Sequence, residues 1–312
     1  MSNLSGNGIR IGTRGSPLAL AQAREVAARL SEAHGLPVER FEIVVIRTSG
    51  DRIQDRPLSE AGGKGLFTKE IEEALLEARI DLAVHSMKDM PTLLPDGLEI
   101  AALLPREDVR DAFISLRFAS LSAMPSGARV GTSSLRRSAQ ISRMRPDLAI
   151  VPLRGNVQTR LRKLEAGEAD ATLLAVAGLH RLGMTDRITA PIPVDDMLPA
   201  VAQGAIGIEI RDADGATRAL VTAIDDPETS VTVSAERAFL GRLEGSCRTP
   251  IAALARLENG NIFLRGEILT PDGVTAHVGA RTARAVDAAS AAEDLADELL
   301  AAAGPRFFEG LA

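Results

Sequence analysis

Basic side chains in this 312-residue chain recur just after short apolar runs. These positions are Arg14, Lys64, Lys88, Arg136, Arg137, Arg154, Arg160 and Arg181. An arginine fork binds a carboxylate through paired hydrogen bonds, so a set of arginines suits a ligand that carries several carboxylates. Any one of these residues could instead be a solvated side chain or half of a surface ion pair.

Arg136 and Arg137 are adjacent in the first turn of an expected helix over residues 134–144. Cations at a helix N-terminus oppose the helix dipole unless an anion lies there. An anionic ligand would remove this conflict, so the pair predicts an anion site.

Asp89 is the acid that follows Lys88 after an apolar run. In a basic site its carboxylate could hold an N–H group or offset positive charge that develops on a ring. Alternatively, it could form an ion pair with Lys88 or a nearby arginine. His85 lies on the same expected strand, and we expect it to be a core residue with its hydrogen bonds satisfied.

Cys247 is the only cysteine of the chain. Gly245 and Ser246 precede it and Arg248 follows, which indicates a turn in an electropositive setting where a thiolate forms more easily. A free cysteine is also often a small buried apolar residue, and the spacing alone leaves both readings open.

The elements that position these residues alternate between strand and helix. Strands are expected over 8–13, 41–47 and 80–87, with helices over 18–34 and 68–78 between them. Ser16, Pro17 and Gly35 are start and stop signals for the first helix. This pattern is typical of a mostly parallel sheet with helices on both faces.

A second set of alternating elements begins near Asp111. Ile11-Gly12-Thr13 and Val130-Gly131-Thr132 both end a strand just before a helix, which suggests two duplicated lobes. Ligands of open α/β sheets bind at the carboxyl ends of the strands. The basic residues are therefore expected to converge on a cleft between the lobes.

Beyond Thr229 the pattern changes to a helix, three strands and a final alanine-rich helix. The strands, over 251–258, 261–269 and 274–282, are joined by Asn259-Gly260 and Pro271-Asp272-Gly273, both strong turn signals. We expect a small antiparallel sheet with helices on it.

Composition excludes several classes of function. The net charge of −6 and the 3% aromatic content, with no Trp or Tyr, argue against nucleic-acid binding. No apolar run reaches the roughly 18 residues of a membrane span. One cysteine and no export signal favour the cytoplasm. The four histidines are scattered, so no metal site is expected.

Several segments, in order along the chain, resemble the hydroxymethylbilane synthase family, also called porphobilinogen deaminase. They include "GTRGSPLALAQ", "AGGKGLFTKEIEEALLEARIDLAVHSMKDMPT", "VGTSSLRRSAQI", "LRGNVQTRLRKL" and "RLEGSCRTPIAA". The resemblance runs from about Ile9 to the C-terminal helix. It implies a transferase of tetrapyrrole and heme biosynthesis, which joins four porphobilinogen molecules head to tail with loss of ammonia and releases the linear tetrapyrrole by hydrolysis.

The resemblance also implies a covalent dipyrromethane cofactor on a Cys247 thioether. Asp89, Lys88 and Arg14 are the implied catalytic residues. The implied cofactor contacts are Cys247, Ser86, Lys88, Asp89, Thr132, Ser133, Ser134, Arg136, Arg137, Arg154, Gly155 and Gln203. The implied contacts to porphobilinogen and the growing pyrrole chain are Arg14, Ser16, Lys64, Arg154, Arg160 and Arg181.

The implied architecture is two α/β lobes like those of periplasmic binding proteins around a cleft, plus a small C-terminal α+β domain with a three-stranded antiparallel sheet. Lobe 1 would take residues 8–104 with 199–224, lobe 2 residues 105–198, and the cysteine-bearing domain residues 225–312. We expect a monomer. The alternative function is a non-catalytic anion-binding protein of the periplasmic-binding-protein type, which would not need Cys247.

Overall fold

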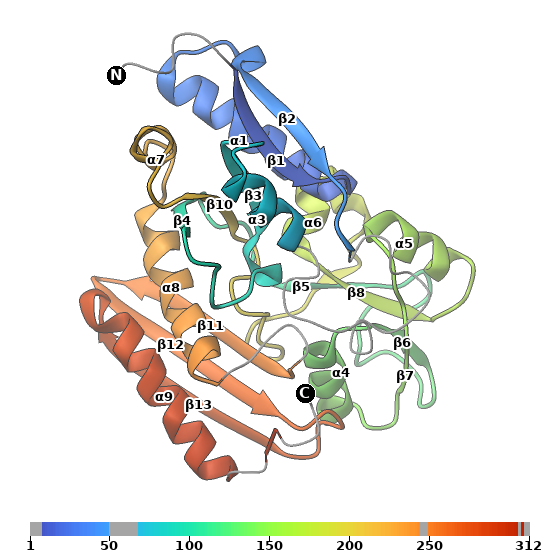
Figure 1. The fold of residues 1–312 in the computed structure, drawn as a ribbon. Coiled ribbons are helices and arrows are strands. Elements are labelled where there is room, and N and C mark those ends of the chain that lie inside the picture. Colours follow the sequence, from blue (N-terminus) through green and yellow to red (C-terminus); the bar gives the residue numbers. More distant parts are fainter. Residues whose placement is uncertain (1–7, 50–67, 244–248, 305–306, 309–312) are drawn as a thin grey trace. The chain divides into compact units, whose positions relative to one another are not determined.

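The structure is a computed structural model that describes residues 8–49, 68–243, 249–304 and 307–308. The chain forms two compact units, residues 1–107 with 205–230 and residues 108–204 with 231–312. The first unit holds one five-stranded sheet, and the second holds another together with a three-stranded sheet (Figure 1).

The first unit is built on the sheet β2-β1-β3-β10-β4. β1 pairs in parallel with β2 and β3, and β10 pairs antiparallel with β3 and β4. The elements are β1 (Ile9–Arg14), α1 (Pro17–His34), η1 (Val38–Arg40), β2 (Phe41–Ile46), α3 (Lys69–Leu76), β3 (Leu82–Ser86), η2 (Met87–Asp89), β4 (Leu98–Leu103), β10 (Ile206–Arg211) and α7 (Gly215–Thr222).

The second five-stranded sheet, β7-β6-β8-β5-β9, repeats this arrangement of directions. β6 is parallel to β7 and β8, and β5 is antiparallel to β8 and β9. The elements are β5 (Asp111–Ile114), β6 (Arg129–Gly131), α4 (Leu135–Met144), β7 (Ala149–Val151), α5 (Val157–Glu165), β8 (Ala171–Ala175), α6 (Val176–Arg181), η3 (Thr185–Arg187) and β9 (Ala190–Pro191). The shared pattern agrees with the predicted echo between the two halves.

The expectation of mostly parallel sheets was wrong in detail. Each five-stranded sheet has two parallel and two antiparallel pairings. β10 comes from far along the chain and inserts between β3 and β4, while β5 inserts between β8 and β9. Such long-range insertions leave no trace in the local alternation of strand and helix.

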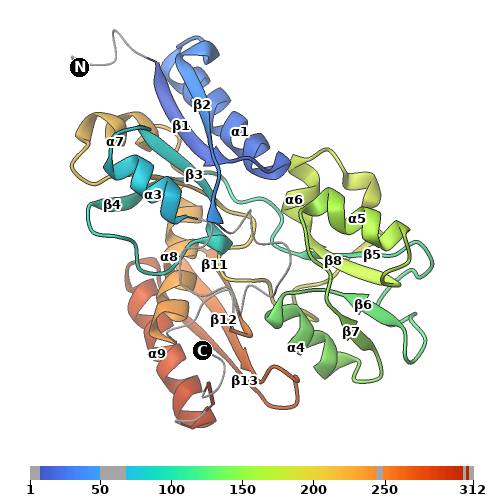
Figure 2. The ribbon, with the colours of Figure 1, turned by 45° about the vertical axis from the view of Figure 1, so that its right-hand side comes forward.

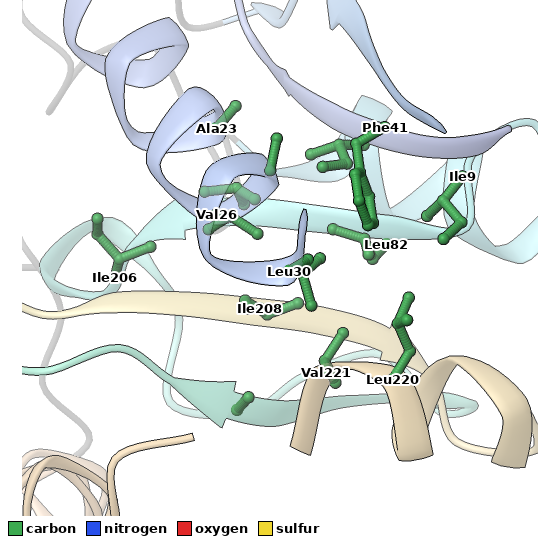
Figure 3. Packing of buried hydrophobic residues seen from close by; sticks show 14 of the residues in the cluster. Ile9, Ala23, Val26, Leu30, Phe41, Leu82, Ile206, Ile208, Leu220 and Val221 are labelled. Atoms are coloured by element: carbon green, nitrogen blue, oxygen red, sulfur yellow. The ribbon is translucent and has the colours of Figure 1, made fainter. Parts of the chain in front are cut away.

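The core of the first unit lies between α1, α7 and the sheet (Figure 3). Val26 and Leu30 of α1 are fully buried, as are Leu82 and Ile208 of the strands beneath. Each such side chain contributes about 1.5–3 kcal/mol of burial free energy. The predicted start and stop signals of α1 are confirmed: Ser16 Oγ accepts from Ala19 N, and Gly35 adopts φ 61°.

The C-terminal part contains α8 (Pro227–Arg242), β11 (Ile251–Glu258), β12 (Asn261–Leu269), β13 (Ala276–Arg284), η4 (Ala285–Asp287) and α9 (Ala288–Ala303). The three strands form an antiparallel sheet in chain order, and α9 runs along β13 (Figure 2). Gly266 leaves room for the ring of Phe239, whose nearest atom would lie 2.4 Å from an added Cβ. The predicted α/β fold with a small antiparallel sheet is confirmed.

None of the helices in the described part of the chain is both long and apolar enough to span a lipid bilayer.

Candidate functional site

One group of predicted site residues lies at a single edge of the first sheet. β1 and β3 are parallel, so their carboxyl ends meet at that edge. β1 ends at Arg14, and β3 ends at Ser86 and continues directly into η2 with Lys88 and Asp89. The side chain of Asp89 is exposed.

The turn that carries Lys88 and Asp89 is held by the residue that directly precedes β10. Met87 N donates to Ala205 O, and Met87 itself is 2% exposed. Ser86 Oγ and the Gln22 amide form reciprocal hydrogen bonds of 2.8 and 3.0 Å. Ser86, which we predicted as a cofactor contact, links β3 to α1 in the structure, and its role toward the cofactor stays a prediction.

His85 is a core residue, as predicted. Its side chain is 5% exposed, and Nε2 lies 2.9 Å from Oε2 of the fully buried Glu209 on β10. Glu72 of α3 lies close enough to both for their charges to affect it. Burial raises the pKa of Glu72, and the neighbouring Glu209 adds to that increase.

A second group of predicted residues lies at one edge of the second sheet, because β6, β7 and β8 are parallel. Thr132, Ser133 and Ser134 follow β6 and lead into α4. Thr132 Oγ1 accepts from Ser134 N at 3.2 Å, and Ser134 Oγ accepts from Arg137 N at the start of the helix. These hydroxyl groups thus stabilise the turn that leads into α4, whose first turn carries Arg136 and Arg137.

Arg136 and Arg137 are buried against Asp111, the first residue of β5. Arg137 Nη2 lies 2.6 Å from Asp111 Oδ1, and Arg136 Nη2 lies 2.8 Å from Oδ2. Arg137 Nε also donates to Asp111 Oδ1, and the two guanidiniums donate to the carbonyls of Leu198 and Leu173. Asp111 therefore supplies the anion that the N-terminus of α4 needs. The helix dipole by itself does not require a ligand there.

The charges of this cluster do not cancel. Two guanidiniums share the carboxylate of Asp111. Glu267 also acts on Arg136, but it is paired with Arg143, so one positive charge remains in excess. Burial would raise the pKa of Asp111, but Arg136 and Arg137 outweigh it and hold that pKa well below its ordinary value. Burial also lowers the pKa of Arg136. A second anion would compensate this remaining charge.

The donor set fits the carboxylates of a dipyrromethane. The Nε of Arg136 is buried and has no hydrogen-bond partner in the described part of the protein. A guanidinium carries five N–H donors, and within the described residues the contacts of Arg136 engage two of them. An acetate or propionate could therefore be bound without breaking the Asp111 contacts.

Arg160 and Arg181, two further predicted site residues, bind backbone carbonyls. Arg160 Nε donates to Gly155 O at 2.8 Å, and Arg181 Nη2 donates to Gly204 O at 3.0 Å. Gly155 has φ 114°, which favours glycine, and an added Cβ would lie 2.5 Å from Thr159. Arg154 follows β7 in the same turn and is half-buried.

Gln203 belongs to the same cluster as the arginines. Its Nε2 donates to Asp111 Oδ1 at 3.0 Å and to Val109 O at 2.7 Å. The Ser16 hydroxyl is used in capping α1. Cys247 and Lys64 lie outside the described residues, so their predicted roles stay predictions, as does the cleft between the lobes.

Two buried acids of this region were missed from the sequence. Asp111 begins the run "DAFI", where a charged residue before apolar ones was the available signal. Glu236 lies in α8 and accepts from the backbone of Ala202 and Ala255. No local pattern marks Glu236, because its partners are distant in sequence.

The described residues define an α/β protein with guanidinium and hydroxyl groups at the carboxyl ends of parallel strands, a class suited to binding anions. Residues 9–219 match the family model "Porphobilinogen deaminase, dipyromethane cofactor binding domain", and residues 230–301 match "Porphobilinogen deaminase, C-terminal domain". The chain belongs to the porphobilinogen deaminase family. The predicted family, its transferase class and its dipyrromethane cofactor are thereby confirmed.

Curated relatives agree over nearly the full chain. The porphobilinogen deaminase of Paracoccus denitrificans is 59% identical over 303 residues, covering 97% of this chain and 97% of the relative. That of Nitrobacter hamburgensis is 59% identical over 298 residues, covering 96% and 94%.

The solved structures that match this chain have much lower sequence identity to it than the curated relatives do. The methionine-binding protein MetQ has a TM-score of 0.43 and 16% identity, covering 72% of this chain and 92% of that one. A substrate-binding domain of a putative amino acid ABC transporter from Streptococcus pneumoniae has a TM-score of 0.42 and 12% identity, covering 70% and 92%. Similarities this weak carry no functional argument.

Proposed function

We propose that this chain acts as a hydroxymethylbilane synthase. It would join four porphobilinogen molecules head to tail, with release of four ammonia molecules, and free the linear tetrapyrrole by hydrolysis. The family membership supports this reaction, and the assignment of individual residues below is our proposal.

A dipyrromethane bound through a thioether to Cys247 would supply the pyrrole carbon to which the first substrate is joined. Arg136 and Arg137 would bind its carboxylates, with Thr132, Ser133, Ser134, Gly155 and Gln203 as further contacts. The arginines can do so because their backbone and Asp111 contacts fix them while donors remain unused.

Asp89 would be the catalytic acid and base. The exposed carboxylate at the end of β3 can accept hydrogen bonds from pyrrole N–H groups and offset the positive charge that develops as ammonia leaves. Lys88 and Arg14, at the same sheet edge, would bind substrate carboxylates and assist Asp89 in catalysis. Ser16, Lys64, Arg154, Arg160 and Arg181 would bind the growing chain.

The observation that carries the proposal is the buried Arg136, Arg137 and Asp111 cluster. It retains one positive charge in excess, and Nε of Arg136, in the first turn of α4, has no hydrogen-bond partner among the described residues. A core built only for stability has no need of a second buried guanidinium, since desolvating each ion costs several kcal/mol. A ligand with several carboxylates explains that surplus charge.

The intact mass of the denatured protein tests the proposal. Wild-type protein should carry a covalent increment that matches two linked pyrroles, and Cys247→Ala should carry none. Ser246→Ala, the neighbouring substitution, is the control and should keep the increment. Active wild-type protein without an adduct, or an adduct that persists in Cys247→Ala, would show that the proposal is wrong.

The alternative of a non-catalytic anion-binding protein is not favoured, because the family models match both the cofactor-binding part and the C-terminal part. We further propose that the protein works as a cytoplasmic monomer without nucleic-acid or membrane partners. Light scattering coupled to size exclusion would test the monomer.

A further inference from the structure

Glu236 is a fully buried acid on α8 that the proposed chemistry does not use. Its two carboxylate oxygens bind two separate stretches of backbone. Oε2 accepts from Ala202 N at 2.6 Å, and Oε1 accepts from Ala255 N at 2.8 Å. One side chain thus joins α8, β11 and the stretch around Ala202.

The stretch around Ala202, residues 198–204, is also where the arginine cluster is anchored; we call it the hub segment. Leu198 O accepts from Arg136 Nη1 at 2.8 Å and from Gln140 Nε2 at 3.0 Å. At its other end, Gln203 donates to Asp111 and Gly204 O accepts from Arg181. The position of the hub segment therefore affects several proposed cofactor and substrate contacts at once.

The backbone of the hub segment is in an unfavourable conformation where Glu236 binds it. Ala202 has φ 58°, in the left-handed region, and its side chain is fully buried. A residue with a Cβ keeps this conformation only where its surroundings hold it. The hydrogen bond from Ala202 N to Glu236 is one of the contacts that do so.

Glu236 and its second partner, Ala255, lie on the two elements that flank the cysteine in the sequence. α8, which carries Glu236, ends at Arg242, and β11, which carries Ala255, begins at Ile251. The chain that contains Cys247 connects these two elements. Glu236 thus joins the two elements on either side of that connection to the hub segment.

We propose that Glu236 is a positioning residue that holds the hub segment on α8 and β11, and with it the arginines that are proposed to bind the cofactor carboxylates. This inference rests on the proposed function. Glu236 would touch neither cofactor nor substrate and would act through the Ala202 and Ala255 backbone.

Glu236→Gln tests this role, because glutamine keeps the size of the side chain but replaces one acceptor oxygen with a donor. One of the two backbone N–H groups then loses its partner. We expect the full-length apo protein, mixed with porphobilinogen, to gain its covalent increment about tenfold more slowly than wild type, the cost of one buried hydrogen bond. Intact mass against time gives the rate.

Phe239→Leu is the matched control. Phe239 is a fully buried residue of the same helix that packs on β12 and has no hydrogen-bonding side chain. This variant should be less stable but should load at the wild-type rate below its unfolding temperature. Amide exchange should accelerate at Ala202 or Ala255 in Glu236→Gln and remain slow at both in Phe239→Leu.

The outcomes separate the two proposals. If wild type gains no increment, the proposed function is wrong. If wild type loads and Glu236→Gln loads at the same rate with unchanged exchange at both amides, the inference about Glu236 is wrong. Should Glu236→Gln fail to fold, Glu236→Asp keeps the charge with a shorter reach, and wild-type loading of that variant would equally overturn it.

Discussion

Asp111 Oδ1 accepts two hydrogen bonds from Arg137, from Nη2 at 2.6 Å and from Nε at 3.2 Å, in a pair whose side chains are 0% and 6% exposed. Oδ2 of the same carboxylate binds Arg136. One buried acid thus holds both arginines that we propose as cofactor contacts, and its removal should disturb the fold and the site together.

Asp111→Asn should destabilise the protein by about 3–5 kcal/mol, because it leaves two buried guanidiniums without their counter-charge. Chemical denaturation measures this loss. Asp195→Asn serves as the control, since Asp195 pairs with Arg265 but its side chain is 83% exposed, and its loss should stay below about 1 kcal/mol. Equal losses in the two variants would contradict the importance of the buried pair.

The stability of the protein should fall at acidic pH because the Asp111 carboxylate becomes protonated. The pKa of Asp111 is lowered in the folded state, so its contribution is present above its ordinary value of 3.8 and is lost as the pH falls below it. Denaturation midpoints between about pH 5 and pH 2 should drop less steeply in Asp111→Asn than in wild type. Parallel curves for the two proteins would refute this.

For Glu72 we expect the opposite dependence of stability on pH. Burial raises its pKa, with Glu209 and Glu73 adding to the increase and His85 opposing it, so its contribution is present below 4.5 and is lost as the pH rises through the folded-state pKa. Glu72→Gln keeps a neutral group, so its stability should match that of wild type at about pH 4 and exceed it at about pH 8. Glu73→Gln, at a half-exposed position on the same helix, should show no such pH-dependent gain in stability.

Gly207→Ala should disturb the turn that carries Lys88 and Asp89. An added Cβ at Gly207 would lie 2.1 Å from Sδ of the buried Met87, which must move. We expect a loss of about 1–3 kcal/mol in stability and lower turnover. Gly215→Ala meets no atom within 4 Å and is the control in the same unit. Wild-type turnover in Gly207→Ala would show that the turn tolerates the shift.

Asp89→Asn should separate cofactor loading from turnover. The amide retains the size of the side chain but cannot carry the negative charge or take up a proton, so ammonia release should fall by about 100-fold or more while the covalent increment stays. Asp96→Asn, another exposed acid of the same unit, should leave ammonia release unchanged. A rate close to wild type in Asp89→Asn would remove this residue from the proposed chemistry.

Much of the local structure was predictable because its signals are local. Ser16 and Gly35 bound α1 as expected, and the Asn259-Gly260 turn has φ values of 49° and 77°. The boundaries of β11 and β12 coincide with their apolar patterns. Antiparallel β10 and β5 were not predictable in this way, because their pairing partners are distant in the chain.

The sequence by itself determined the family, the order of strands and helices, and the basic residues at the strand ends, since each depends on residue types at short spacing. Only the tertiary structure decided what those residues contact. Arg136 and Arg137 were expected to need a ligand at their helix end, but Asp111 reaches them from β5. Glu236 gained its place between Ala202 and Ala255 in the same way, because buried polar groups find partners in space and not along the chain.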